Sequence, residues 1–354
     1  MKNAINSLLT LIRLALIAVI CHSAANAESP DKWKAKLFPV DRNGKWGFID
    51  VAGGVVIEPQ FQEVSYFSEK VATVKLKGKY GYIDEAGKIV IEPRFSYAFP
   101  FHEGLAWVQG DHSGFIDKTG EFALWAPEGC YCREFREGLA KTMPYPPPPA
   151  IAQTEFEPKR QVGFIDKTGK YAINPQFDVA WDFEEGLAAV SIDKKWGFID
   201  TTGRFVIPLD YDGAHYFSEG IAAVVVDGKT VFIDKTGNRV IQTKYDDAHP
   251  FREGLCAAKF GAKWGYINRS GTVVIEPKYH SVSSFSNGLA GVEVDRKWGY
   301  INKKGDVIIA PIYDYGHFFL GELAEVTFHA ARGDGAGRGY VNRTGRVVWN
   351  PEPR

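Results

Sequence analysis

Cysteine is scarce in this sequence: the 354 residues contain four, of which three follow the first 27 residues. Such a small and odd number does not make a disulfide framework, so packing must hold the fold together. A charge of one sign is also missing, since 42 Lys and Arg oppose 43 Asp and Glu. Because a nearly neutral chain has no electrostatic reason to bind nucleic acid, we expect no nucleic-acid partner.

Long apolar runs are absent as well. The run between Arg13 and His22 has eight residues, far fewer than the roughly 18 that a membrane span needs. It follows a basic segment and precedes the small-residue sequence Ala-Asn-Ala that ends at Ala27, a pattern typical of a cleaved secretory signal. We therefore predict that residues 1–27 are a signal peptide and that residues 28–354 form a single repeat array.

Cys21 offers an alternative, a lipidated N-terminus. Ile20 stands where a small residue should precede such a cysteine, so a mature chain that starts at Glu28 is the better interpretation. The expected location is the periplasm or the extracellular space, and the mature form is expected to have no membrane span.

Repetition is what the sequence has in abundance. One glycine position recurs along the chain, with valine in the sixth copy: Gly47, Gly81, Gly114, Gly163, Gly197, Val231, Gly265, Gly299 and Gly339. Successive copies are 34, 33, 49, 34, 34, 34, 34 and 40 residues apart. An Asp or Asn follows each copy by three residues and a glycine follows it by six. This regularity indicates nine equal structural units.

The repeated phrase reads Trp-Gly-Phe-Ile-Asp, first at residues 46–50. It resembles the bacterial WG-repeat family, and the resemblance extends roughly from Lys36 to Pro351, nearly the whole mature chain. The resemblance implies an all-β fold. No catalytic residue set belongs to the family's motif, so the resemblance implies no activity.

Each unit carries three strand signals, for example Leu187–Ile192, residues 196–200 and Phe205–Ile207. Asp200 opens the second turn, where its side chain can bond the backbone two residues on, and Gly203 supplies a positive φ. Calcium binding by these aspartates is the functional alternative. Three of the nine are Asn and no second carboxylate recurs at short spacing, so a structural role is favoured.

The middle strand is apolar on both faces, so we expect it to be covered on both sides with its tryptophans inside. Its glycine indicates close approach by a neighbouring backbone or ring, most simply the next repeat. An aromatic ladder is the natural core filler, with a glycan-binding stripe as the sharper alternative. The ladder consists of Phe61, Phe95, Phe177, Tyr211, Tyr245, Tyr279 and Tyr313.

These observations predict an all-β repeat protein of about nine three-stranded antiparallel meanders, stacked as an open curved solenoid. The alternative is a β-propeller that uses the Tyr211–Phe217 stretch as a fourth strand. Propellers usually have four to eight blades of four strands. Because no swapped terminal strand is visible to close a ring, the open solenoid is favoured.

Two insertions interrupt the repeat, near residues 143–160 and 329–338, both in the turn between a unit's first and second strands. Insertions on one face of a repeat protein often line its binding face, although tolerated loop drift is an equal alternative. The candidate partner-binding residues are Tyr145, Pro146, Pro147, Arg332 and Asp334. Residues 332–334 also spell an integrin-type tripeptide, which chance explains well in a glycine-rich loop.

Two other side chains recur at fixed repeat positions and are candidates for metal binding or acid–base catalysis. His215, His249 and His317 share one repeat position, but a metal site needs further ligands, so satisfied or surface histidines are the simpler interpretation. The glutamate of the Phe-x-Glu-Gly phrase recurs in six similar environments, which is typical of a turn residue and not of an acid–base pair.

The function expected from the sequence is an exported scaffold that binds a protein or cell-envelope partner. The alternative is a glycan- or peptidoglycan-binding module that uses exposed aromatic rings. We expect no catalysis, no cofactor and no metal site, because the sequence offers no nucleophile with its base and no ligand cluster.

Overall fold

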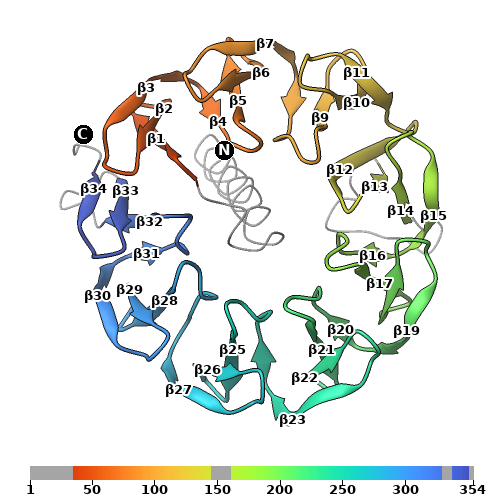
Figure 1. Ribbon diagram of the computed structural model, residues 1–354, viewed down its shortest axis with the longest axis vertical. Helices are drawn as coiled ribbons and strands as arrows, with labels where there is room; N and C mark the ends of the chain where they lie inside the picture. Colours follow the sequence, from red (N-terminus) through yellow and green to blue (C-terminus); the bar gives the residue numbers. More distant parts are fainter. Residues whose placement is uncertain (1–34, 145–160, 329–336, 351–354) are drawn as a thin grey trace, which may run out of the picture. The chain divides into compact units, whose positions relative to one another are not determined.

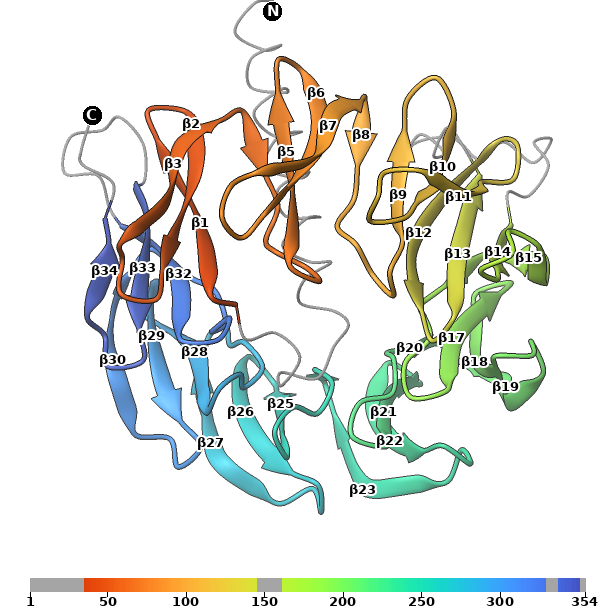
Figure 2. The same cartoon turned by 45° about the horizontal axis from the view of Figure 1, so that its top comes forward.

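The computed structural model describes residues 35–144, 161–328 and 337–350. Ala35–Arg354 forms one compact unit, and its described residues fold into nine small antiparallel sheets that stand in a ring (Figures 1 and 2). Within these ranges there is no helix, and thus none that is long and apolar enough to cross a membrane. The all-β prediction is confirmed.

We call the sheets blades and number them in chain order. Blades 1 to 3 comprise β1 (Leu37–Arg42), β2 (Lys45–Asp50), β3 (Val55–Phe61); β4 (Glu63–Val64), β5 (Val71–Leu76), β6 (Lys79–Asp84), β7 (Ile89–Phe95); and β8 (Tyr97–Ala98), β9 (Ala106–Gln109), β10 (Ser113–Ile116), β11 (Phe122–Trp125). Blades 4 to 6 comprise β12 (Cys130–Arg136), β13 (Leu139–Pro144), β14 (Val162–Ile165), β15 (Tyr171–Phe177); β16 (Val179–Ala180), β17 (Leu187–Ile192), β18 (Lys195–Asp200), β19 (Phe205–Tyr211); and β20 (Gly213–Ala214), β21 (Ile221–Val226), β22 (Lys229–Asp234), β23 (Arg239–Tyr245).

Blades 7 to 9 comprise β24 (Asp247–Ala248), β25 (Leu255–Phe260), β26 (Lys263–Asn268), β27 (Val273–Tyr279); β28 (Leu289–Val294), β29 (Lys297–Asn302), β30 (Val307–Tyr313); and β31 (Tyr315–Gly316), β32 (Leu323–Phe328), β33 (Gly337–Asn342), β34 (Val347–Trp349). In seven of these nine sheets the described strands number four, and each strand pairs with the next. The last strand of each blade runs along the outside of the ring (Figure 1).

The open solenoid was the wrong choice, and the propeller alternative is correct. The additional strand comes first in its blade and is only two residues long in most blades, and β20 lies inside the Tyr211–Phe217 stretch named for it. The ring closes without a swapped strand, because blade 1 packs directly on blade 9. Phe38 meets Tyr340 edge to face with 5.5 Å between ring centroids, and the Tyr340 hydroxyl donates to the carbonyl oxygen of Pro39 at 3.0 Å.

The turn after each middle strand follows the sequence prediction. In blade 5 the Asp200 carboxylate accepts the backbone N–H of Thr202 at 2.9 Å and that of Arg204 at 3.1 Å. Gly203 has a φ of 83°, a left-handed conformation that glycine adopts at no steric cost. All nine copies have both hydrogen bonds, the asparagines included, so a short side-chain acceptor explains the position without calcium.

The middle strand is covered on both faces, as expected. Phe198 packs toward blade 6 and Ile199 toward blade 4, and both are fully buried. The tryptophans are less enclosed than predicted: Trp264 is buried, whereas Trp46, Trp196 and Trp298 are half-buried. The core therefore rests on the phenylalanine or tyrosine two residues after each tryptophan position.

The glycine of the middle strand serves its own blade, which corrects the expectation of a neighbouring repeat. A Cβ atom at Gly197 would lie 2.6 Å from the carbonyl oxygen of Ile207 and 2.7 Å from that of Pro208, both in β19. The pairing of β18 with β19 shifts register there. The bulged outer strand thus passes directly over the glycine.

Candidate functional site

The residues that the sequence singled out for partner binding lie outside the described residues. This holds for Tyr145, Pro146 and Pro147 in the first insertion and for Arg332 and Asp334 in the second. The strands around them are described: the first insertion joins β13 to β14 and the second joins β32 to β33. Both insertions therefore follow the same strand of their blade.

The recurring histidines do not form a cluster of ligands. His215 and His249 are half-buried, and burial lowers the pKa of both imidazoles. The His249 ring packs on Trp264 with 4.8 Å between centroids. Among the residues that the structure describes, no group of three His, Cys, Asp or Glu side chains is placed to hold a metal ion.

The aromatic ladder is core. Six of its seven rings are buried, and Tyr211 is half-buried. The rings of the ladder therefore belong to the core and do not form an exposed stripe. The three described cysteines are free, with Cys132 and Cys256 buried and Cys130 half-buried.

One repeat position changes from serine to ionisable side chains between blades. It is the residue after the phenylalanine of the Phe-x-Glu-Gly phrase. In three blades it is a serine whose hydroxyl donates to a backbone carbonyl of the next blade at 2.6–2.7 Å; these are Ser68, Ser218 and Ser286. Blades 3, 4, 5 and 7 have His102, Arg136, Glu184 and Arg252 instead. Three consecutive blades and blade 7 thus have ionisable side chains at this position, whereas blade 6 between them keeps the structural serine.

Blade 4 departs furthest from the repeat. Its first strand, β12, has seven residues where the corresponding strands have two. In the described part of the chain, the only buried charged residues are Glu134, Arg136 and Lys141, all in this blade. Since a buried charge is costly unless it is paired, their partners define the site.

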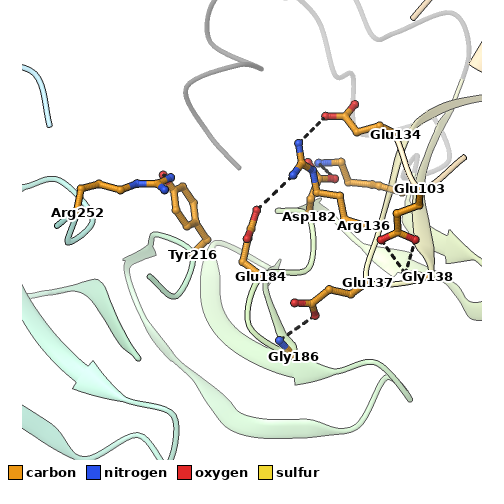
Figure 3. Close-up of polar contacts among 11 residues, drawn as sticks. Glu103, Glu134, Arg136, Glu137, Gly138, Asp182, Glu184, Gly186, Tyr216 and Arg252 are labelled. Atoms are coloured by element: carbon orange, nitrogen blue, oxygen red, sulfur yellow. Dashed lines mark hydrogen bonds and ion pairs between the residues drawn. The ribbon is translucent and has the colours of Figure 1, made fainter. Parts of the chain in front are cut away.

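Arg136 lies between two carboxylates (Figure 3). Its Nη2 is 3.4 Å from Glu134 Oε1 in the same strand, and its Nη1 is 3.7 Å from Glu184 Oε1 in blade 5. Lys141 makes the second link between these blades, with its Nζ 3.1 Å from Asp182 Oδ1 and donating to the Ala180 carbonyl at 3.0 Å.

Two further residues extend this group toward blade 7. The Arg252 guanidinium donates to the Tyr216 hydroxyl at 3.3 Å, and in the view of Figure 3 Tyr216 lies between Arg252 and Glu184. We call Glu134, Arg136, Lys141, Asp182, Glu184, Tyr216 and Arg252 the polar cluster.

The two carboxyls beside Arg136 differ in acidity. Burial raises the pKa of Glu184 to about 7, against the opposing effect of Arg136 and Arg252. Burial also disfavours the charged form of Glu134, but Arg133 and Arg136 outweigh it and lower the pKa of that carboxyl. The cluster therefore holds a permanent anion and a carboxyl that titrates near neutral pH.

Acid–base enzymes also use two carboxyl groups whose pKa values differ. Here the guanidinium of Arg136 occupies the position between them and contacts both. The arrangement pairs charges from blade 4 with charges from blade 5.

The model of the WG-containing repeat matches seven segments, at residues 46–80, 80–110, 163–196, 196–229, 232–264, 264–298 and 298–328. The chain belongs to the WG-containing repeat family. The matched repeats leave out residues 111–162, which include β12 and β13. The polar cluster thus draws three residues from the stretch that departs from the WG repeat.

Among curated proteins no match to this WG-repeat chain is found. Among solved structures, a eukaryotic initiation factor is similar at 9% identity and a TM-score of 0.52, covering 89% of this chain and 94% of that one. At this identity the likeness shows the fold alone. BamB from Moraxella catarrhalis has 12% identity, coverage of 87% and 89% and a TM-score of 0.40, and Hsv2p of Kluyveromyces lactis has 7%, 79% and 92%, and 0.42.

Sequence reasoning missed the polar cluster because it looked for function in the insertions. The signal was present in the aligned repeats, where a charged residue stands in place of serine at Arg136, Glu184 and Arg252. What the sequence does not show is that these positions from different blades meet.

Proposed function

We propose that this protein is an exported, non-catalytic scaffold that binds a protein or cell-envelope partner through the polar cluster. One observation carries the proposal: ionisable side chains replace a serine that the ring uses for its own hydrogen bonds. A buried charge destabilises a fold unless its pairing is complete. Adjacent blades bring these charged side chains together at one place on the ring, which supports a role in recognition.

A protein partner is favoured over a glycan. Glycan binding was expected to depend on solvent-facing rings of the aromatic ladder, and those rings are in the core. The charges of the polar cluster match the hydrogen-bonding groups of a polypeptide or of charged envelope material.

The test is a pull-down from the native envelope with the wild-type protein and with an Arg136→Gln, Glu184→Gln double variant. Losing one partner of an interfacial charge pair costs about 2–5 kcal/mol, so the double variant should lose the partner. Arg204→Gln is the control, since that side chain is 80% exposed and far in sequence from β12. Equal capture by all three proteins contradicts the proposed surface, and capture of glycan alone favours the alternative.

Export has its own test. Mass spectrometry of exported material should give an N-terminus at Glu28, because the small residues before it fit a signal peptidase site. A retained N-terminus, or a diacylglyceryl mass on Cys21, contradicts cleavage at this site and attaches the protein to a membrane.

A further inference from the structure

A repeated hydrogen bond links neighbouring blades from blade 2 to blade 8. The glutamate of the Phe-x-Glu-Gly phrase has a φ of 50–56°, and its carboxylate accepts the backbone N–H of the matching glycine in the next blade at 2.8–3.1 Å. The six pairs are Glu69 with Gly104, Glu103 with Gly138, Glu137 with Gly186, Glu185 with Gly220, Glu219 with Gly254, and Glu253 with Gly288. We call these contacts the seam.

A cation reinforces most of the seam. In four junctions a lysine of the next blade lies 3.0–3.2 Å from the same carboxylate; these are Lys118, Lys167, Lys235 and Lys303. In a fifth, Arg269 donates to the backbone carbonyl of Glu219. Hydrogen bonds to a charged group are stronger than neutral ones, so the seam resists separation of the blades that it joins.

The seam joins blades 2 to 8 and is missing from the other three junctions, two of which are those of blade 1. Gly321 of blade 9 and Ala35 of blade 1 stand where the other blades have glutamate, and blade 8 has Asn287. The cation position is also lost, because blade 1 has Val51 and blade 2 has Glu85 there. Neither junction of blade 1 has the carboxylate and the cation that join blades 2 to 8.

Blade 1 is linked to blade 2 by the chain itself, so the weak junction is the one with blade 9. That junction includes side-chain packing among Phe38, Val40, Ile49, Leu323 and Tyr340, and the hydroxyl of the last residue donates to a backbone carbonyl of blade 1. The Arg42 guanidinium also lies 5.2 Å from the centroid of the Trp349 ring. As at every other junction of the ring, no sheet is shared across it, so what sets it apart is that it has neither the seam nor a chain connection.

We propose that the propeller opens reversibly between blade 9 and blade 1 while the seam holds blades 2 to 8 together. The opening exposes the apolar faces of β1 and β33 and gives the ring two states. The proposal does not depend on the identity of the partner or on the polar cluster.

Thiol labelling of the full chain under native conditions tests it. Val40 faces blade 9 in blade 1, and Val224 occupies the same repeat position in blade 6, where it faces blade 5 across a complete seam. Both are buried, at 2% and 0% exposed. Val40→Cys should react about tenfold faster than Val224→Cys, since only the first thiol is uncovered by opening below the cost of global unfolding. Peptide mass separates the new thiol from the native ones.

Completing the seam should suppress the opening. Gly321 already has a φ of 61°, close to that of the seam glutamates, so Gly321→Glu fits the backbone, and Val51→Lys supplies the cation. In this background the labelling of Val40→Cys should slow several-fold. Gly321→Ala with Val51→Lys is the matched control, which lacks the carboxylate and should not slow it.

A second pair guards against misfolding of the first. Ile49→Cys and Ile233→Cys occupy another shared position on the same two faces, and both residues are buried. Equal labelling rates within each pair overturn the proposal, as does a completed seam that leaves the rate at Val40→Cys unchanged.

Discussion

At the scale of single residues, the middle-strand glycine is the position whose identity the geometry requires most strictly. Gly197→Ala places a Cβ atom against two backbone carbonyl oxygens of β19, which cannot rotate away. Overpacking of this kind costs roughly 1–3 kcal/mol. Chemical denaturation should show that loss. Gly110→Ala is the control, since its Cβ would meet nothing closer than 3.8 Å, and a similar loss there would contradict the steric explanation.

Glu184 makes the folding stability of the ring depend on pH. Its raised pKa means that the folded state keeps a proton that the unfolded chain releases, so its contribution to stability is present at low pH and is lost as pH rises through about 7. Glu184→Gln resembles the protonated form at every pH. The melting temperature of this variant should gain on that of the wild type between about pH 5 and pH 8.

The exposed Glu276→Gln serves as the comparison for this titration. It should follow the wild type across the same range. A Glu184→Gln curve that runs parallel to the wild-type curve would mean that the carboxyl is ionised throughout.

Other residues show how far sequence reasoning reached. Asp200 and Gly203 were assigned correctly because a turn depends on local backbone geometry alone. Trp196 was placed too deep, since the alternation of a strand gives the face of a residue but not how far the adjacent blade covers it.

At the scale of elements, the seam joins blades through backbone and side chain together. Glu185→Ala removes the acceptor of the Gly220 N–H and the partner of Lys235. A hydrogen bond to a charged group contributes roughly 1.5–3 kcal/mol, and partial exposure reduces this to about 1 kcal/mol. Denaturant unfolding should show the loss, and it should shrink at high salt. Glu276→Ala, on an outer strand, should change stability by less than about 0.5 kcal/mol.

The two-residue first strands explain why the number of strands per blade was underestimated. Gly213–Ala214 pairs with Val224 and Val225 of β21, yet two residues are too few to show the period-2 alternation by which strands are recognised. The long β12 of blade 4 was missed for another reason. It lies in the interval between Gly114 and Gly163, where the copies are 49 residues apart and the repeat no longer indicates where strands begin.

At the scale of the whole molecule, the sequence determined nine equal units but not whether the array is open or closed. Closure depends on a small rotation per unit, added nine times, and no single residue reports it. The absence of a swapped strand predicts an open array, whereas side-chain packing and one hydrogen bond to a backbone carbonyl join blade 9 to blade 1. A closed ring brings residues from opposite ends of the chain into contact, which an open stack does not. The energetic coupling between such residues can be measured.

A double-mutant cycle between Phe38 and Tyr340 measures closure directly. Their rings meet at 5.5 Å although they belong to the first and last blades, and such an aromatic pair contributes about 0.5–1.5 kcal/mol beyond its burial. Phe38→Leu, Tyr340→Leu and the double variant should therefore show a coupling of that size in denaturant unfolding. The same cycle between Phe38 and Tyr266, which is buried in blade 7, should be additive within about 0.3–0.5 kcal/mol. In an open solenoid the first pair would lie many units apart and would be as additive as the second, so additivity of both pairs would refute the closed ring.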